Sequence, residues 1–453
     1  MCKKSSLTIL FFLLLAMAGF GQARKIEFTE YDLPNGMHVI LHKDNTTPIV
    51  AVSVLYHVGS KNEDPKRTGF AHFFEHLLFE GSENIKRGEF DKYLSNAGAT
   101  NNANTSNDRT FYYEVLPSNQ LELGLWMESE RLMHAKIETI GVETQREVVK
   151  EEKRQRIDNQ PYMTFQSEIF KRAYKTHPYQ WTPIGSLEHL NEASLDEFIN
   201  FYKTFYVPEN ATLSIAGDID IEQTKAHVAK YFKDIPRGGK TIPRPTVAEP
   251  QQTAEVRDVI FDNVQLPAVF QAYHIPAQGT PDSYALDMLS TVLSGGQSSR
   301  MYKSIVDEQK KAMQVASFPF SLEDPGLYIT LGLVNMGVNI DDLEKAMDAE
   351  VEKVKNELIS EKEFQKIRNQ MESQFVQQNA TTFGIAEQLA NYHVYFKDAN
   401  LINTEIDRYM KVTREDLQRV AKKYLTKENR VVLHYLPKSA QSKPENTQLK
   451  KDN

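Results

Sequence analysis

Cysteine is almost absent from this 453-residue chain, because Cys2 is the only one. It lies before an apolar run at residues 7–18, inside a segment unlike the rest of the sequence. The chain beyond that segment therefore has neither disulfides nor thiolate chemistry. Any metal site would have to be built from histidine and carboxylate side chains.

The chain also lacks an excess of basic residues. Lys and Arg number 53 against 61 Asp and Glu, giving a net charge of -8 at pH 7. Nucleic acids and anionic membranes attract basic surfaces, so neither is expected as a partner. Hydrophobic residues make up 40% of the chain, and its length predicts at least two domains with large cores.

No apolar run is long enough to span a bilayer, which needs about 20 residues. Lys3 and Lys4 precede the apolar run at 7–18, and mostly small residues follow at 19–23. This three-part pattern predicts a secretory signal peptide at residues 1–23, with an uncleaved anchor as the alternative. We expect a periplasmic or secreted protein without a membrane span once the signal is removed.

Strand-like and helix-like segments alternate along the chain, and the second half repeats the first. Residues 264–274 resemble residues 49–57, since each is an apolar strand ending in Tyr-His before a loop and a helix. Such duplication predicts an α+β fold of two homologous α/β-layered halves, each a mainly antiparallel sheet packed with helices. The predicted boundaries are an N-terminal half at 24–236, a Gly- and Pro-rich linker at 237–253, a C-terminal half at 254–436 and a polar, disordered tail at 437–453.

The pattern with the clearest chemistry is His72-Phe73-Phe74-Glu75-His76. Helix positions four apart lie on one face, so the two imidazoles can point at one ion. Two histidines, a carboxylate ligand and one open position are typical of catalytic zinc, with Glu75 placed to take a proton from the attacking water. The order H-x-x-E-H is the inverzincin signature.

Five residues alone do not establish a metal site. Such a pattern arises by chance in roughly one chain in fifty of this composition, and two surface histidines beside a glutamate would look the same. A third ligand is therefore required. The acidic segment at 143–152 offers several carboxylates, but a helix that carries this charge is often only a solvated face.

The surrounding residues resemble the pitrilysin/insulinase family of zinc peptidases, including its bacterial two-domain members and the mitochondrial processing peptidase. Residues 69–81 (GFAHFFEHLLFEG) and 145–152 (QREVVKEE) carry the resemblance. The family's third ligand lies about 76 residues after the second histidine, which falls on Glu152, with Glu151 as the rival. The resemblance thus implies one zinc ion per chain, held by His72, His76 and Glu152.

The same resemblance implies further site residues. Gln145 stands where many members carry a second glutamate close to the metal, and Glu143 or Glu147 are the possible substitutes. Asn102 and Ala103 match the family's substrate-pairing strand, which can bind an extended peptide by adding it to the sheet. Phe79 matches a phenylalanine that lines the pocket just after the cleaved bond. The alternatives are an ordinary strand and a core aromatic residue.

One family feature is missing. Active single-chain members carry an Arg and a Tyr seven positions apart in the second half, which polarise the substrate carbonyl. Here these positions fall on Val306 and Met313, or on Asp307 and Gln314 after a slip of one residue. None can replace the arginine, so we expect a homologous subunit to supply both groups.

The resulting hypothesis is a zinc-dependent endopeptidase that hydrolyses peptides or unfolded segments as the zinc-bearing subunit of a heterodimer. One alternative is a non-catalytic scaffold member of the family, although such subunits usually have a damaged metal motif. Another is a peptide-binding protein with structural zinc, which would show closed four-ligand coordination.

Overall fold

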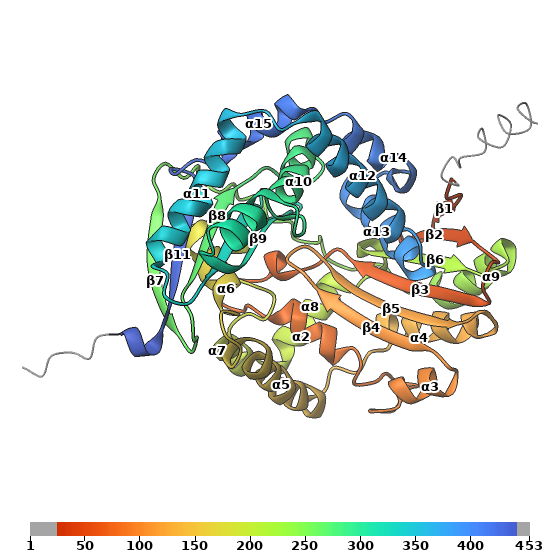
Figure 1. Ribbon diagram of the computed structural model, residues 1–453. Coiled ribbons are helices and arrows are strands. Elements are labelled where there is room, and N and C mark those ends of the chain that lie inside the picture. The colour runs from red at the N-terminus through yellow and green to blue at the C-terminus, as the bar shows by residue number, and fades with distance from the viewer. Residues whose placement is uncertain (1–24, 442–453) are drawn as a thin grey trace, which may run out of the picture.

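The computed structural model describes residues 25–441, which form two sheets surrounded by helices (Figure 1). The first sheet contains β1 (Thr29–Asp32), β2 (His38–Lys43), β3 (Ile49–Tyr56), β4 (Thr100–Thr105), β5 (Thr110–Pro117) and β6 (Ala211–Gly217). The second contains β7 (Val256–Asp262), β8 (Ala268–His274), β9 (Ala312–Phe320), β10 (Leu327–Val334) and β11 (Arg430–Pro437). The predicted signal peptide and the tail beyond residue 441 lie outside the described residues.

The helices follow the same division along the chain. The first half contains α2 (Phe70–Leu77), α3 (Phe90–Asn96), α4 (Leu121–Met133), α5 (Thr139–Lys153), α6 (Phe165–Ala173), α7 (Leu187–Glu192), α8 (Leu195–Phe205) and α9 (Ile221–Phe232). The second contains α10 (Pro281–Ser294), α11 (Ile340–Asn356), α12 (Glu361–Gln378), α13 (Thr382–Phe396), α14 (Leu401–Met410) and α15 (Arg414–Tyr424). Between residues 25 and 441, no helix has both the length and the apolar character needed to cross a bilayer.

The two sheets share one topology, which confirms the predicted duplication. With β1 set aside, the strand orders are β2-β6-β3-β5-β4 and β7-β11-β8-β10-β9. The parallel pair stands at the same place in both, β2 with β6 and β7 with β11, and the other pairs are antiparallel. The strand β4 is an edge of the first sheet, and β9 is the corresponding edge of the second.

Each half contributes one helix to the sheet of the other half. From the first half, α6 packs on the second sheet, where Phe170 meets Phe320 with ring centroids 5.1 Å apart. From the second half, α13 covers the first sheet, where Leu389 joins Ala51 in one buried cluster. The irregular segment at 237–253 therefore separates the strands of the two sheets without separating the two cores.

The alternation of side chains along β3 places α13 and α2 on opposite faces of the first sheet. Ala51 and Leu55 belong to the clusters that contain α13 residues. Val52 and Val54 belong to the large cluster that contains Phe70 and its neighbours on α2. Because successive side chains of a strand point to opposite faces, both faces of the sheet are buried. Figure 1 shows the same layers.

The C-terminal boundary differs slightly from the prediction. β11 continues through Pro437, and Lys438–Ala440 form a single 3-10 turn. Ordered backbone therefore extends a few residues into the segment that composition alone predicted to be disordered. Most of the predicted tail lies outside the described residues, so its disorder stays a prediction.

An ion-pair network joins the two halves near the end of β9. The Lys61 ammonium lies 3.1 Å from Asp108 within its own half, and 2.5 Å from Glu323 and 3.1 Å from Asp324 in the other half. His57 lies 2.8 Å from Glu323. Lys61 and Asp108 are each only 5% exposed at the side chain, so solvent screens their interaction little.

This network predicts loss of stability in acid. Burial alone would raise the pKa of Glu323, but contacts with His57 and Lys61 outweigh it and hold that pKa at about 2. An unfolded glutamate titrates near 4.3. The contribution of Glu323 is therefore complete above about pH 4.3 and is lost as the pH falls towards 2. We expect the free energy of unfolding to fall less steeply between pH 5 and 2 in Glu323→Gln than in wild type. The exposed control Glu352→Gln should keep the wild-type slope, and equal slopes in all three proteins would contradict the prediction.

Candidate metal centre

The helix α2 starts where two glycines meet. Gly69 has φ of 99°, and a Cβ on Gly185 would lie 2.3 Å from the Gly69 nitrogen, so only glycine fits at either position. The carboxylate of Glu63 accepts hydrogen bonds from the N–H groups of Gly69 (2.9 Å) and Ala71 (2.8 Å). A buried carboxylate thus satisfies the first turn of α2, where the helix dipole favours negative charge.

Three of the predicted metal ligands converge across α2 and α5. His72 and His76, one turn apart on α2, have ring centroids 4.9 Å apart. An oxygen of Glu152 on α5 lies 3.4 Å from Nε2 of His72 and 3.0 Å from Nε2 of His76. The side chains are 11%, 23% and 15% exposed, respectively, so one side of the group remains accessible.

Glu75 lies beside the same group. Its carboxylate and the ring nitrogens of His72 and His76 fall within 4.8 Å of one another. Burial raises the pKa of Glu75. A carboxylate with a raised pKa accepts a proton more readily, which suits the role of general base.

Glu152 occupies the last turn of α5, where the helix dipole disfavours a carboxylate. Arg156 compensates, because it lies 2.7 Å from one oxygen of Glu152, while the other oxygen faces the two histidines. The contact with His76 is the largest of the effects that hold the pKa of Glu152 below its ordinary value. Glu151, the rival, is 53% exposed and contacts Arg154 and Gln155 instead. The geometry therefore favours Glu152.

The three proposed ligands fit a zinc ion. Tetrahedral bonds of about 2.1 Å imply ligand atoms spaced by about 3.4 Å, close to the separations between Glu152 and the two rings. Burial, with a smaller effect of His76, lowers the pKa of His72 to about 4, so its imidazole is neutral and has a free lone pair. One oxygen of Glu152 is buried without a hydrogen-bond donor. A cation between these acceptors would satisfy all of them.

The α5 residues that were predicted to lie near the metal differ in burial and in their bonding partners. Gln145 is partly buried, and its amide donates to Glu80 at 2.5 Å, while its own amide oxygen is buried without a partner. Glu143 and Glu147 are 59% and 72% exposed and pair with lysine or arginine on their own helix. Neither therefore replaces the second glutamate of the family.

The predicted substrate-pairing residues lie on the edge strand β4. Asn102 and Ala103 pair with Tyr113 and Tyr112 of β5, and no strand within residues 25–441 covers the other side of β4. The N–H of Ala103 donates to the side-chain oxygen of Asn102 at 2.9 Å. An incoming peptide strand would have to displace this side chain to reach the main chain.

Phe79, a predicted substrate-binding residue, is half-buried. Its ring contacts Arg131, a buried arginine that the sequence analysis missed. The guanidinium of Arg131 stacks on Phe79, Phe90 and Tyr112, with its central carbon 4.5, 4.4 and 4.3 Å from the ring centroids. It also donates to the carbonyl oxygen of Leu78 at 2.9 Å. Arg131 thereby supports the segment that follows the metal-binding helix.

Two fully buried glutamates balance this arginine. Arg131 lies 3.0 Å from Glu128 and 3.5 Å from Glu114, and all three side chains are at most 1% exposed. Burial and the charge of Glu128 raise the pKa of Glu114 well above its ordinary value. No local sequence pattern marks such a cluster, because it depends on which strand faces which helix.

Removing Arg131 should destabilise the protein strongly. Arg131→Met leaves two buried carboxyl groups without their cation, a change that costs about 3–5 kcal/mol in comparable buried pairs. The measurement is the free energy of unfolding from urea denaturation. Arg154→Met is the control, since Arg154 is 58% exposed and its ion pair should contribute less than about 1 kcal/mol. Similar losses in both variants would contradict the prediction.

In the second half, no arginine or tyrosine stands at the two positions that the family would use. Val306 lies in a turn of π-helix and packs against the second core, and Met313 is 54% exposed on the edge strand β9. Arg300, just upstream, is held by Glu363 at 2.9 and 3.0 Å. The hydrogen bonds and ion pairs that the described residues form with His72, His76 and Glu152 all come from the first half.

Comparison with known proteins agrees with this arrangement. Residues 38–184 match the family model described as Insulinase (Peptidase family M16), and residues 192–371 match the one described as Peptidase M16 inactive domain. A zinc protease of Helicobacter pylori, PqqE, is 32% identical over 395 residues, covering 86% of this chain and 89% of the relative. The chain belongs to the M16 peptidase family.

Two further relatives of this M16 chain are informative. The crystal structure of a protease from Helicobacter pylori superimposes with a TM-score of 0.87 at 30% identity, covering 91% of this chain and all of that one. The probable β subunit of the mitochondrial processing peptidase of Arabidopsis thaliana is 25% identical over 409 residues, covering 87% of this chain and 75% of the relative. The predicted family and fold are thus confirmed, and peptidase relatives include a subunit of a larger enzyme.

Proposed function

We propose that this M16 chain is a zinc-dependent endopeptidase in which His72, His76 and Glu152 hold one zinc ion and Glu75 is the general base. The observation that carries the proposal is the convergence of these four side chains from α2 and α5. Zinc peptidase relatives support the same assignment.

The chemistry assigned to the protein groups is hydrolysis of a peptide bond. When bound, zinc acts as a Lewis acid and makes a water molecule acidic near neutral pH. Glu75 accepts the proton of that water as its oxygen attacks the carbonyl carbon, and then delivers the proton to the leaving amine. The buried position of His72 keeps its imidazole neutral, so no protonation competes with its role as ligand.

Substrate binding is assigned to the edge of the first sheet. An extended peptide pairs with the main chain at Asn102 and Ala103, and the side chain after the cleaved bond lies near Phe79. The edge position of β4 within residues 25–441 supports this mode, because strand addition needs an unpaired edge. Peptides and unfolded segments can supply such a strand, whereas a folded protein cannot.

A homologous subunit is proposed to complete the site. Val306 and Met313 lack the groups that would stabilise the developing oxyanion, an interaction worth about 3–4 kcal/mol when one donor is lost. The proposed partner is an M16 chain that carries an Arg and a Tyr at these two positions. The leader-like segment at 1–23 supports a periplasmic or secreted location for the pair.

A structural role for zinc is the main rival. It would require a fourth protein ligand. Glu151 is exposed and contacts Arg154, so it does not support closed coordination, and the amide N–H of Gln145 is held by Glu80. An open position favours catalysis over a peptide-binding or scaffold role.

The decisive experiment is peptide hydrolysis by the mature chain, alone and mixed with M16 homologues that bear the missing Arg and Tyr. We expect one zinc per chain, little activity alone and strong activity in the mixture. Changing the partner's Arg and Tyr should remove that gain. Full activity of the chain alone would refute the partner requirement, and no activity in any mixture despite bound zinc would refute the catalytic proposal.

A further inference from the structure

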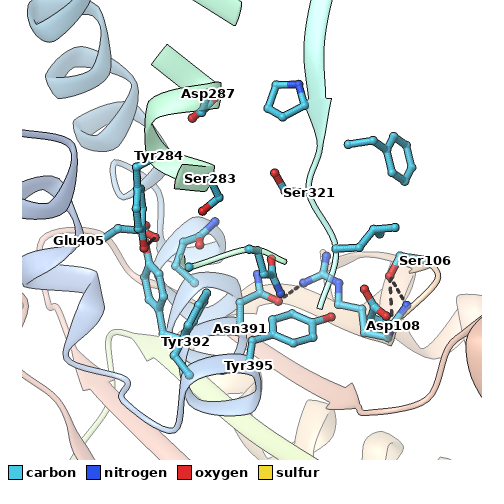
Figure 2. Close-up of a pocket in the computed structure, with 18 of the residues that line it drawn as sticks. Ser106, Asp108, Ser283, Tyr284, Asp287, Ser321, Asn391, Tyr392, Tyr395 and Glu405 are labelled. Atoms are coloured by element: carbon cyan, nitrogen blue, oxygen red, sulfur yellow. Dashed lines mark hydrogen bonds between the residues drawn. The ribbon is translucent and has the colours of Figure 1, made fainter. Parts of the chain in front are cut away.

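A cavity of about 500 Å³ lies between the two halves, away from the metal centre (Figure 2). Its walls come from the β4–β5 loop, the end of β9, the start of α10, and the helices α13 and α14. Four tyrosines contribute to the lining, Tyr284, Tyr392, Tyr395 and Tyr409. A space of this size accommodates a small organic molecule.

Two carboxyl groups, those of Asp287 and Glu405, line this cavity. Asp287 accepts a hydrogen bond from the hydroxyl of Tyr409 at 2.7 Å. Glu405 accepts hydrogen bonds from the hydroxyls of Tyr284, at 3.2 Å, and Tyr392. Neither carboxylate forms an ion pair within residues 25–441. Figure 2 shows Glu405 beside the two tyrosines Tyr284 and Tyr392, with Asp287 further along the same wall.

The other charged groups of the cavity are already balanced. Asp108 lies 3.1 Å from Lys61, and Arg109 lies 2.5 Å from Glu387. The guanidinium of Arg408 donates to the hydroxyl of Tyr284 at 3.0 Å, and its charge also acts on Glu405. Within residues 25–441, neither Asp287 nor Glu405 forms a direct ion pair.

Burial raises the pKa of both Asp287 and Glu405, while the tyrosine hydroxyls that donate to them, and the charge of Arg408 at Glu405, oppose that rise. A further cation in the cavity would stabilise the ionised form of both groups. An ionised carboxylate offers about four acceptor sites, so both groups can bind further donors beside the tyrosine hydroxyls. The rings of Tyr284 and Tyr409 are 4.9 Å apart and nearly perpendicular, and the guanidinium of Arg408 already lies 5.9 Å from the centroid of the Tyr284 ring. The ring of Tyr409 therefore adds a second aromatic group that can attract a cation.

The cavity is separate from the proposed peptide site. Its α13 wall lies on one face of the first sheet, whereas α2, with His72 and His76, lies on the other. A peptide paired with β4 at the metal centre would not have to enter it. A ligand bound here would contact both halves at once, since the β4–β5 loop belongs to the first half and α10 to the second.

We infer that this cavity binds a small organic cation, through its ammonium or guanidinium groups, between Asp287, Glu405 and the surrounding tyrosines. The carboxylates supply charge, the tyrosine rings supply cation–π contacts, and the hydroxyls hold the carboxylates in place. This site is independent of the zinc chemistry.

The test is calorimetric titration of the mature, zinc-loaded chain with putrescine and, separately, with agmatine, at 150 mM salt. We expect saturable binding of one molecule per chain by at least one of the two. Asp287→Asn or Glu405→Gln should weaken binding at least 10-fold each, and the double variant should abolish it. Asp407→Asn, which removes an exposed charge from α14, should bind like wild type. The uncharged 1,4-butanediol should not bind.

A thermal melt of each unliganded variant separates loss of binding from loss of fold. Because the substitutions remove carboxylates that have no direct ion pair, their melting temperatures should equal or exceed that of wild type. The inference is overturned if neither amine binds up to millimolar concentration, if the double variant binds as tightly as wild type, or if Asp407→Asn weakens binding as much as Asp287→Asn does. Any of these would identify the space as a solvent-filled packing cavity.

Discussion

Glu75→Gln is expected to lower kcat/KM for peptide hydrolysis by about 10²- to 10⁴-fold, the usual range for loss of a general base. Glutamine has nearly the same shape but cannot accept a proton. The substitution should leave zinc bound, since the proposed ligands His72, His76 and Glu152 remain. Activity is measured with the partner present if the chain alone is inactive.

The matched control is Glu147→Gln, which makes the same chemical change on α5 at a side chain that is 72% exposed. It should retain wild-type activity. Both variants should contain one zinc per chain and melt near the wild-type temperature. If Glu75→Gln keeps activity within about threefold of wild type, another group must be the base.

Glu152→Gln is expected to weaken zinc binding by more than about 10²-fold, because altering even outer partners of a metal ligand costs 10–100-fold. The amide lacks the charge that pairs with the cation. Competition with a chelator of known affinity measures the change. Peptide hydrolysis should fall in parallel and recover partly when excess zinc is supplied.

Glu151→Gln is a matched control, because Glu151 and Glu152 are adjacent in sequence but their side chains contact different residues. Glu151 is 53% exposed and contacts Arg154, so its variant should keep wild-type zinc affinity. The reverse result, with zinc lost from Glu151→Gln and kept by Glu152→Gln, would show that the arrangement of the last turn of α5 is different in solution.

The part of the site that sequence reasoning predicted best is the part encoded locally. His72, Glu75 and His76 share one helix, and the helical repeat alone predicts that their side chains meet. Glu152 lies 76 residues further on, so no local rule could connect it with them. Its position came from family resemblance, and the structure brings it within 3.0 Å of His76.

Other supporting residues could not be predicted because their roles depend on long-range burial. Glu63 precedes α2 by seven residues and resembles any loop carboxylate until its contacts with Gly69 and Ala71 are known. From the sequence alone, Arg131 and Glu128 resemble an ordinary charged pair on an exposed helix, but both side chains are buried. Charge in a sequence usually indicates exposure, and these residues are exceptions because they balance one another.

The exchange of helices between the halves could not be predicted from the sequence either. The halves repeat in strand order, and the linker lies between them, which suggests two self-contained domains. The hydrophobic faces of α6 and α13 show only that each helix is buried somewhere. Which sheet they cover depends on the path of the chain in three dimensions.

This exchange has a consequence for the order of events during synthesis. The last strand of the first sheet, β6, ends at Gly217, but α13 does not begin until Thr382, 165 residues later (382 minus 217). A chain made from its N-terminus onward, or threaded across a membrane in that direction, leaves one apolar face of its first sheet uncovered over all that length. The growing protein should therefore depend on chaperones, and truncation within the second half should turn the first into a target for aggregation and proteolysis.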